Sequence, residues 1–460
     1  SALPARASGM TVRVPPGRAR GARPAADLIL MIMTVRGGLR SFGRRTFASF
    51  AVRNYRWYFA GALVSNIGTW MQRTCQDWLV LVDLTDHSST ALGYVTALQF
   101  LAMPFLAPYA GAVVDRFAKR SVLRVTQALL GLNALWLWAL IATHAVALWQ
   151  VYLFAFAQGA ITSFDSPARQ AFVSEMVSRR LIPNAVGMNS MSFNAARIIG
   201  PGLAGLLIAA FGVGPGMLVN ALSFAAMLAG LAMMSADELH PAEPRRGGGA
   251  AREGLSYVGH HPEILIIFVI AFMTGTFGMN FQITNATMAT EVFGRGAAQY
   301  GALGTIMAVG TLGAAVIAAR RRNPRVRTLM IGLVGFTAAD TALALAPDYW
   351  VYAVLLVPTG LCALTVLTCA NSAVQVASAP QLRGRVLALY AALTMGGTPI
   401  GAPIVGWVGD VLGPRWSLLV GSIGTGVTVV GVLFYYVVHE GLRFDRHGMH
   451  RPPGAVRPAG

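Results

Sequence analysis

The sequence predicts an all-α membrane protein in which twelve transmembrane helices form two pseudo-symmetric six-helix halves. Three observations support this prediction. Only 12% of the 460 residues are charged and 55% are hydrophobic, with a mean hydropathy of +0.57, whereas about a quarter of a water-soluble chain is charged. Twelve apolar stretches are long enough, or nearly so, to cross a hydrocarbon core of about 30 Å. The basic residues lie almost entirely on one side of these stretches.

The apolar stretches follow one another with short polar connections, and only the fourth is short for a membrane span. Sequence defines their ends to within several residues. In order along the chain they are Trp57 to Val82, Ala91 to Val114, Ser121 to Thr143, Leu148 to Phe164, Asn184 to Phe211, Gly216 to Met234, Ile264 to Thr290, Tyr300 to Ala319, Leu329 to Ala346, Trp350 to Ala370, Val386 to Leu412 and Trp416 to Val438.

The distribution of Lys and Arg predicts which side of the membrane each connection faces. With the N-terminus in the cytoplasm, 32 of the 36 basic residues fall in cytoplasmic segments, and the outer connections hold only Arg295 and Arg415. This positive-inside asymmetry places both termini in the cytoplasm. The net charge of +18 therefore reflects topology, and we expect contact with the lipid bilayer and none with nucleic acid.

The chain divides into five regions, two of which are related halves. The stretch that begins at Gly200 in the first half is repeated in the stretch that begins at Gly401 in the second. The fifth and eleventh predicted helices are therefore repeat partners, as in transporters built from related halves. The connection between the halves is rich in Pro and Gly, which predicts a flexible linker. The regions are 1–55, a basic, disordered cytoplasmic extension; 56–235, the N-terminal half; 236–262, the cytoplasmic linker; 263–438, the C-terminal half; and 439–460, a cytoplasmic tail.

The segment GAVVDRFAKR, between the second and third predicted helices, carries the sharpest motif. It resembles the signature of the major facilitator superfamily, although Ala118 stands where that signature has Gly. The resemblance implies a conformational gate on the cytoplasmic side, in which the Asp faces a helix N-terminus and a neighbouring Arg bridges to an acid. A basic turn with an incidental Asp is the alternative. The gate residues are Gly111, Asp115, Arg116, Lys119 and Arg120, with Asp165 as the acidic partner of Arg116.

The fifth predicted helix carries a second motif, which resembles the antiporter motif of the same superfamily with Ala in place of Gly at two positions. Its Pro removes a helix hydrogen bond and is expected to kink the helix. The resemblance favours efflux as the direction of transport, and a plain packing kink is the alternative. The motif residues are Gly187, Gly200, Pro201 and Gly205.

Ionisable groups inside membrane spans are candidates for function because they are costly to place there. Arg73 and Asp77 lie four residues apart in the first predicted helix and so share one face. We expect Asp77 to be the proton-coupling site with Arg73 as its partner; a structural ion pair is the alternative. Asp340 and Asp410 are weaker candidates.

A substrate cavity is expected between the halves, on helices that the superfamily resemblance selects. Polar residues there would line water, although hydrogen bonds between helices would explain them equally. In the fourth helix, Ala155 stands where proton-coupled exporters of the superfamily have Arg, so coupling through that arginine is excluded. The expected cavity residues are Asn66, Phe154, Gln158, Asn280, Gln282, Asn285 and Thr359.

The resemblance covers about residues 55–438 and is most similar to the bacterial branch of enterobactin exporters and transmembrane secretion effectors. It implies a monomeric secondary active transporter of the bacterial inner membrane that couples the efflux of small amphipathic compounds to protons. Uptake, lipid flipping by the same fold, and a non-transporting sensor or scaffold are the alternatives. The chain has no metal-spaced Cys or His cluster, phosphate-binding loop or nucleophile elbow, so we expect no metal, no cofactor and no enzymatic activity.

Overall fold

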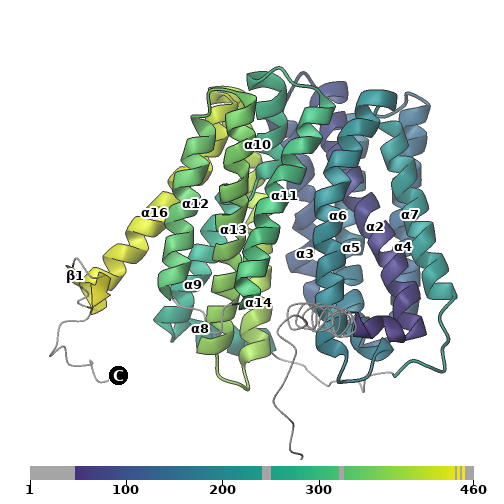
Figure 1. The fold of residues 1–460 in the computed structure, drawn as a ribbon, viewed down its shortest axis with the longest axis horizontal. Helices are drawn as coiled ribbons and strands as arrows, with labels where there is room; N and C mark the ends of the chain where they lie inside the picture. Colours follow the sequence, from purple (N-terminus) through teal and green to yellow (C-terminus); the bar gives the residue numbers. More distant parts are fainter. Residues whose placement is uncertain (1–46, 241–249, 321–325, 441–442, 446–447, 451–460) are drawn as a thin grey trace, which may run out of the picture.

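The computed structural model describes residues 47–240, 250–320, 326–440, 443–445 and 448–450, whose helices stand side by side as one bundle (Figure 1). The extension 1–46, the linker residues 241–249 and the tail beyond residue 450 lie outside the described residues. The first half consists of η1 (Ala48–Ala51), α2 (Arg53–Trp78), η2 (Leu79–Leu84), α3 (Ser89–Arg116), α4 (Lys119–Ala142), α5 (Leu148–Met176), α6 (Ile182–Phe211) and α7 (Gly214–Ala232).

The second half contains a broken rod made of four segments and another made of α14 and α15. Together with the other long helices they give twelve helical rods in the described chain. The elements are α8 (Ala250–Gly259), α9 (Pro262–Met273), η3 (Thr274–Gly278), α10 (Phe281–Thr287), η4 (Met288–Val292), α11 (Ala297–Arg320), α12 (Val326–Ala344), α13 (Tyr349–Ala377), α14 (Arg383–Gly396), α15 (Thr398–Leu412), α16 (Pro414–Glu440), β1 (Arg443–Asp445) and β2 (Gly448–His450).

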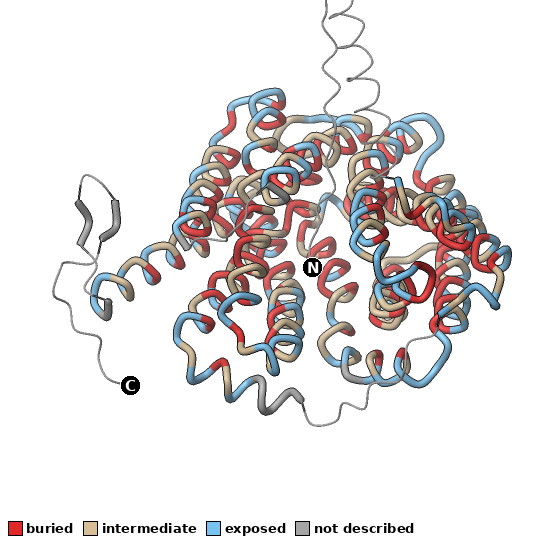
Figure 2. The backbone as a smooth tube through the Cα atoms, turned by 60° about the horizontal axis from the view of Figure 1, so that its bottom comes forward, coloured by how far each residue is buried: buried red, intermediate tan, exposed pale blue. Residues whose placement is uncertain are grey.

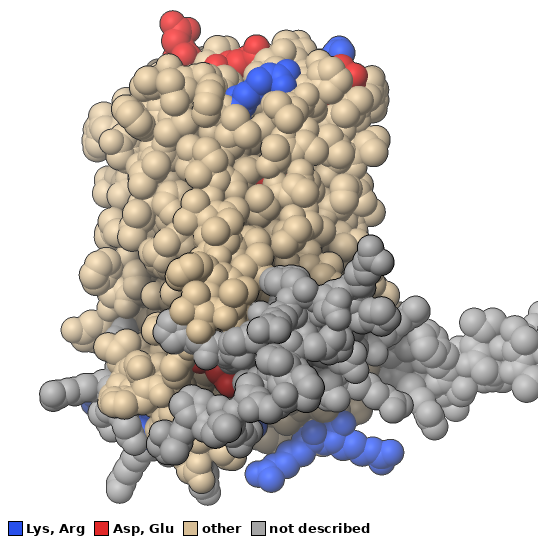
Figure 3. All heavy atoms as spheres, turned by 90° about the vertical axis from the view of Figure 1, so that its left-hand side faces the viewer, with Lys and Arg blue, Asp and Glu red and all other residues tan. Residues whose placement is uncertain are grey.

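The helices present apolar side chains outward, as expected of a protein that contacts lipid. Trp136, Leu206 and Phe434 are each more than 60% exposed, and Figure 2 shows exposed residues alternating with buried ones along the outer helices. Figure 3 shows charged atoms gathered at the two ends, with a broad band between them that is almost entirely uncharged. A soluble monomer rarely exposes so much contiguous apolar surface. The all-α membrane fold is therefore confirmed.

Nine of the described helical segments are long and apolar enough to span a membrane. The other three rods, α2, α5 and α12, fall short of that measure, so twelve spans stays a prediction for them. The antiparallel pair β1 and β2, with Phe444 opposite Met449, is the one departure from helical structure among the described elements.

Two segments are more helical than the sequence indicated. Helix α5 continues past Phe164 to Met176, because Phe172 and Val173 keep one face apolar and buried after the lipid-facing stretch ends. The linker was expected to be flexible, yet its residues 250–259 form α8, which packs Val258 into the core of the second half.

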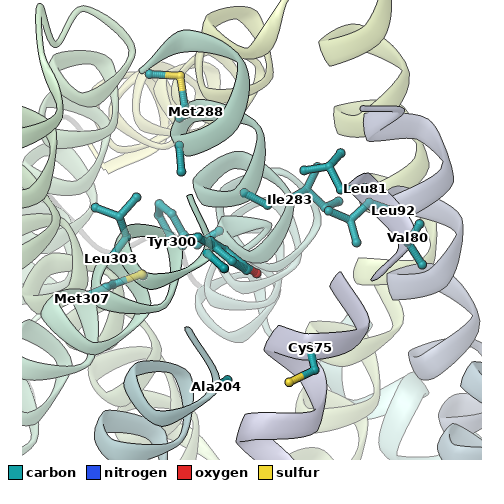
Figure 4. Close-up of a cluster of buried hydrophobic side chains, with 14 of the residues drawn as sticks. Cys75, Val80, Leu81, Leu92, Ala204, Ile283, Met288, Tyr300, Leu303 and Met307 are labelled. Atoms are coloured by element: carbon teal, nitrogen blue, oxygen red, sulfur yellow. The ribbon is translucent and has the colours of Figure 1, made fainter. Parts of the chain in front are cut away.

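The apolar core joins the two halves at one end only. We call the end where α2 begins and α8 lies the linker end, and the opposite end the distal end (Figure 1). The largest core cluster combines Leu81 and Leu92 of the first half with Ile283 and Leu303 of the second, at the distal end (Figure 4). Toward the linker end each half has a separate cluster. The halves are therefore closed against each other distally and separate toward the linker end.

Candidate functional site

Two cavities meet in the middle of the bundle and share Trp70 and Arg73 of α2. The smaller, of about 250 Å³, lies between the halves and is lined from α2, α3, α6, α10 and α11. The larger, of about 740 Å³, lies within the first half and is lined from α2, α4, α5, α6 and α7. We call them the interdomain chamber and the N-half chamber. A pocket of several hundred Å³ is typical of a small-molecule site, and polar as well as apolar side chains line both of these.

Asp77 lies in the interdomain chamber and connects the two halves. Its side chain is 3% exposed, and its Oδ2 accepts a hydrogen bond of 3.0 Å from the hydroxyl of Tyr300 on α11. Tyr300 also stacks on Trp78, with ring centroids 6.1 Å apart. Because α2 and α11 belong to different halves, any motion that separates the halves here must break this hydrogen bond.

Arg73 lines both chambers but does not form an ion pair with Asp77 among the described residues. Its guanidinium lies over Trp70, 5.2 Å from the ring centroid, and over Phe100 at 5.8 Å. Its Nε is buried and has no hydrogen-bond partner within the described chain. The expected pair thus shares a chamber without the direct contact that an ion pair needs.

Arg197 of α6 lines the same chamber, and it was given no role from the sequence. Its guanidinium lies 5.6 Å from the Trp70 ring centroid, so two arginines flank one indole. With Asp77 as the acidic group of the lining, the chamber carries an excess of positive charge. Sequence could have found Arg197, because an arginine within a membrane span is a functional candidate by default. Tyr300 gave no such signal.

Five of the seven expected cavity residues line the chambers. Phe154 instead packs against the distal core, and Thr359 is buried with its hydroxyl donating to the Leu355 carbonyl of its own helix at 2.7 Å. These two expectations were wrong, because helical position alone does not show which face looks inward. The five lining residues are Asn66 and Gln158 in the N-half chamber, and Asn280, Gln282 and Asn285 in the interdomain chamber.

The motif of α6 brings this helix close to its neighbours. A Cβ added to Gly205 would lie 2.6 Å from the Ala297 carbonyl oxygen of α11, and one added to Gly200 would lie 2.6 Å from the Trp70 Cβ of α2. Pro201 lies within the helix and lines the interdomain chamber. Gly187, nearer the linker end, has nothing within 4 Å. Close contact at this motif is therefore made by Gly200 and Gly205, and not by Gly187.

The gate motif makes its contacts within the first half. Lys119 forms an ion pair of 3.2 Å with Glu175, and Arg120 donates to the Leu231 and Met234 carbonyls at the end of α7. A Cβ added to Gly111 would meet no atom within 4 Å, so this glycine makes no close contact with the other half.

The expected bridge between Arg116 and Asp165 is also absent. Asp165 pairs with Arg169 at 2.5 Å and accepts from Thr126 and Gln127, while Arg116 and Asp115 are exposed. Arg116 and Asp165 both belong to the first half, and the bridge is absent because Asp165 is already engaged by its neighbours on α4 and α5.

Asp410 of α15 closes the distal end. Its carboxylate accepts hydrogen bonds from the Ser88 hydroxyl at 2.9 Å and from the backbone N–H groups of Ser89 and Thr90 at 2.6 and 3.1 Å. These N–H groups belong to the first turn of α3, where the helix dipole favours a negative charge. The contact joins the two halves; Asp410 was a weaker proton-coupling candidate, and this contact was not predicted from the sequence.

Two helical halves around a central cavity define the architecture of a secondary transporter. The chain belongs to the transmembrane secretion effector family of the major facilitator superfamily, whose profile matches residues 44–446. The family is one of transporters, so the chain is not an enzyme.

Similar proteins include a siderophore transporter and an efflux pump. The chain is 23% identical over 268 residues to the staphyloferrin A transporter of Staphylococcus aureus, an alignment that covers 57% of this chain and 66% of that protein, just under two thirds. It is 24% identical over 404 residues to the multidrug efflux pump Tap of Mycolicibacterium fortuitum, covering 82% and 93%.

Solved structures share the fold at low identity. A bacterial homologue of the human lysosomal transporter Spinster, inward-facing and unoccupied, matches with a TM-score of 0.64 at 13% identity, over 84% of this chain and 95% of that one. A D-xylose-proton symporter matches with a TM-score of 0.63 at 14% identity, over 83% and 95%. At this identity the likeness shows the fold alone.

Proposed function

We propose that this protein is a secondary active transporter of the bacterial plasma membrane that exports small amphipathic compounds in exchange for protons. The similarity to an efflux pump and to a siderophore transporter supports this substrate range. The close contact that the α6 motif makes with the other half supports the direction. The positive-inside asymmetry supports a cytoplasmic linker end, and on that orientation the N-half chamber receives compounds from the cytoplasm.

The hydrogen bond between Asp77 and Tyr300 carries the proposal. It ties an ionisable group, buried beside the cavity, to a contact that exists only while the distal end is closed. When the distal end opens, Asp77 loses this donor and meets external water, from which it takes a proton. When the linker end opens, the proton leaves toward the cytoplasm and the donor returns. A carboxyl group that changes partner with conformation is the element that proton coupling needs.

The test uses everted membrane vesicles from cells that express the protein. An interior acidic pH gradient should drive accumulation of a transported fluorescent compound, and a protonophore should abolish it. Asp77→Asn should lose gradient-driven accumulation, because the amide takes up no proton. Asp83→Asn, an exposed acid six residues along the chain, is the matched control and should behave as wild type.

Two results would contradict the proposal. Accumulation by Asp77→Asn equal to that of wild type would remove Asp77 from coupling. Gradient-driven accumulation that occurs only in right-side-out vesicles would make the protein an importer.

A further inference from the structure

A second buried carboxyl group lies in the C-terminal half, on α12. Asp340 is 2% exposed; its Oδ2 accepts a hydrogen bond of 3.2 Å from Ser422 on α16. Its Oδ1 is buried and has no hydrogen-bond partner among the described residues. The ion pairs found in the described chain both lie in the first half, so Asp340 has no basic partner there. An ionised carboxylate in such a place is costly unless a positive charge compensates it.

The groups that face Asp340 supply no such charge. Among the described residues on the elements packed around it, Tyr352 of α13 is the titratable group that interacts with it electrostatically. The hydroxyl of Tyr352 donates to Asn285 at 2.8 Å and so is already engaged. Ser422 provides the single hydrogen bond to the carboxylate. No described residue therefore compensates a negative charge on Asp340.

The helix that faces Asp340 is interrupted at this level. Segment η3 ends at Gly278 and α10 begins at Phe281, which leaves Asn280 in the break. The Asn280 Nδ2 donates to the Thr276 carbonyl at 2.7 Å and to the Phe277 carbonyl at 3.3 Å, so its Oδ1 is the free end of the amide. That oxygen is buried and also lacks a partner within the described residues. Interrupted helices of transporters supply backbone carbonyl oxygens to coupling ions, and here the unpaired oxygen in the break is that of a side-chain amide.

A small cavity of about 10 Å³ lies between these groups. This is close to the least volume that holds one water molecule. A water there could donate to both unpaired oxygens but would leave the charge of Asp340 uncompensated. A cation would interact with the unpaired oxygens and also neutralise that charge. The cavity is lined by Asp340, Asn280, Phe277, Gly278, Phe281, Thr284, Ser417 and Leu418.

We propose that Asp340 and Asn280 form a binding site for one small monovalent cation, a proton or Na⁺. A proton is held on the Asp340 carboxyl group. Na⁺ is held between the Asp340 and Asn280 side-chain oxygens, the hard oxygen ligands that such ions prefer. The site lies in the other half from Asp77, and it does not depend on the direction of transport.

The cation site and the interdomain chamber share two residues, Asn280 and Phe281. Occupation of the cation site therefore acts on the helix break that forms part of the chamber wall. If the cation changes the affinity of the chamber for a compound, the compound changes the affinity for the cation by the same factor. In this way the second half couples ion binding to substrate binding through its own residues.

The test measures thermal unfolding of three purified, detergent-solubilised full-length proteins, namely the wild type and the variants Asp340→Asn and Asp83→Asn. NaCl replaces choline chloride at constant ionic strength, at mildly acidic and mildly alkaline pH. In choline chloride the wild type should lose stability as the pH rises, by up to about tenfold in the folded-to-unfolded ratio per pH unit. Asp340→Asn, which is neutral at every pH, should lose that part of the response, and Asp83→Asn should keep it.

The sodium series separates the two cations. If the site binds Na⁺, each tenfold rise in Na⁺ above its Kd at alkaline pH multiplies the folded-to-unfolded ratio of the wild type by about ten, and Asn280→Ser weakens this effect. If the site holds a proton only, Na⁺ acts as choline does and the pH response stays. Equal responses of wild type and Asp340→Asn to both pH and Na⁺ would overturn the proposal. Asp340→Ser, which is also neutral, repeats the comparison if the amide variant does not fold.

Discussion

Asp410→Ala should shift the protein toward the state that is open at its distal end. The substitution removes all three hydrogen bonds to the start of α3 and the charge that faces this helix N-terminus. Loss of a comparable N-terminal cap costs about 0.5–2 kcal/mol, and the dipole contributes about 0.3–1 kcal/mol. Because Asp410 is exposed and partly screened by water, we expect about 1–2 kcal/mol in total. That is about a five- to thirtyfold change in the ratio of the two states.

The assay follows access to the interdomain chamber from outside the cell. Thr96 of α3 lines that chamber and is buried, so Thr96→Cys reports its opening. The native cysteines, Cys75, Cys362 and Cys369, are first replaced by Ser. A membrane-impermeant thiol reagent applied to intact cells should label the cysteine about five to thirty times faster after Asp410→Ala than before it.

Asp410→Asn is the matched intermediate, because it keeps one acceptor oxygen and loses the charge. It should lie between the parent and the alanine variant. An unchanged labelling rate in Asp410→Ala, with the same expression level and melting temperature as the parent, would refute the reasoning. It would mean that the contact at α3 contributes nothing to distal closure.

Three further predictions concern the chambers and their closure. Gly205→Leu should prevent α6 from reaching α11, since even a Cβ there lies 2.6 Å from the Ala297 carbonyl oxygen; we expect a loss of at least about 2 kcal/mol of distal closure, measured by the same labelling assay. Arg197→Gln should weaken the binding of carboxylate-bearing compounds about tenfold relative to neutral analogues, because it removes one of two cations beside Trp70; tryptophan fluorescence titration measures this. Tyr300→Phe should keep binding but move the pH dependence of transport, because Asp77 loses its donor; vesicle transport at several pH values checks it.

Sequence predicted the membrane class and the helical rods, because lipid imposes length and hydropathy on every span. Of the polar residues that line the chambers, the expected cavity list named five. It did not predict contacts that depend on the conformational state. The gate motif predicts a bridge from Arg116 to Asp165, yet Arg116 is exposed here and Asp165 pairs with Arg169. A motif names residues that meet in one state of a moving protein, whereas a structure describes one state.

The missed residues have a different cause. Tyr300 was missed altogether, and Asp410 was a weaker candidate whose contact with α3 was missed. Both act through partners more than 200 residues away in the chain, and no sequence pattern points to such a partner. Phe154 and Thr359 were misplaced for a related reason. Their helices are apolar on nearly every side, so periodicity did not show which face turns toward the cavity.

The sequence repeat between the fifth and eleventh helices has a counterpart in the contacts. Gly205 of α6 packs on the start of α11 at Ala297, while its repeat partner Gly406 of α15 packs on the start of α3 at Ser89. Since α3 and α11 are the second helices of their halves, one glycine contact occurs twice, in pseudo-symmetric positions. Both contacts lie at the distal end and both must part for it to open. Asp410 strengthens only the contact between α15 and α3. The two glycine contacts therefore need not open with equal ease, and a change of charge can act on the contact at α3.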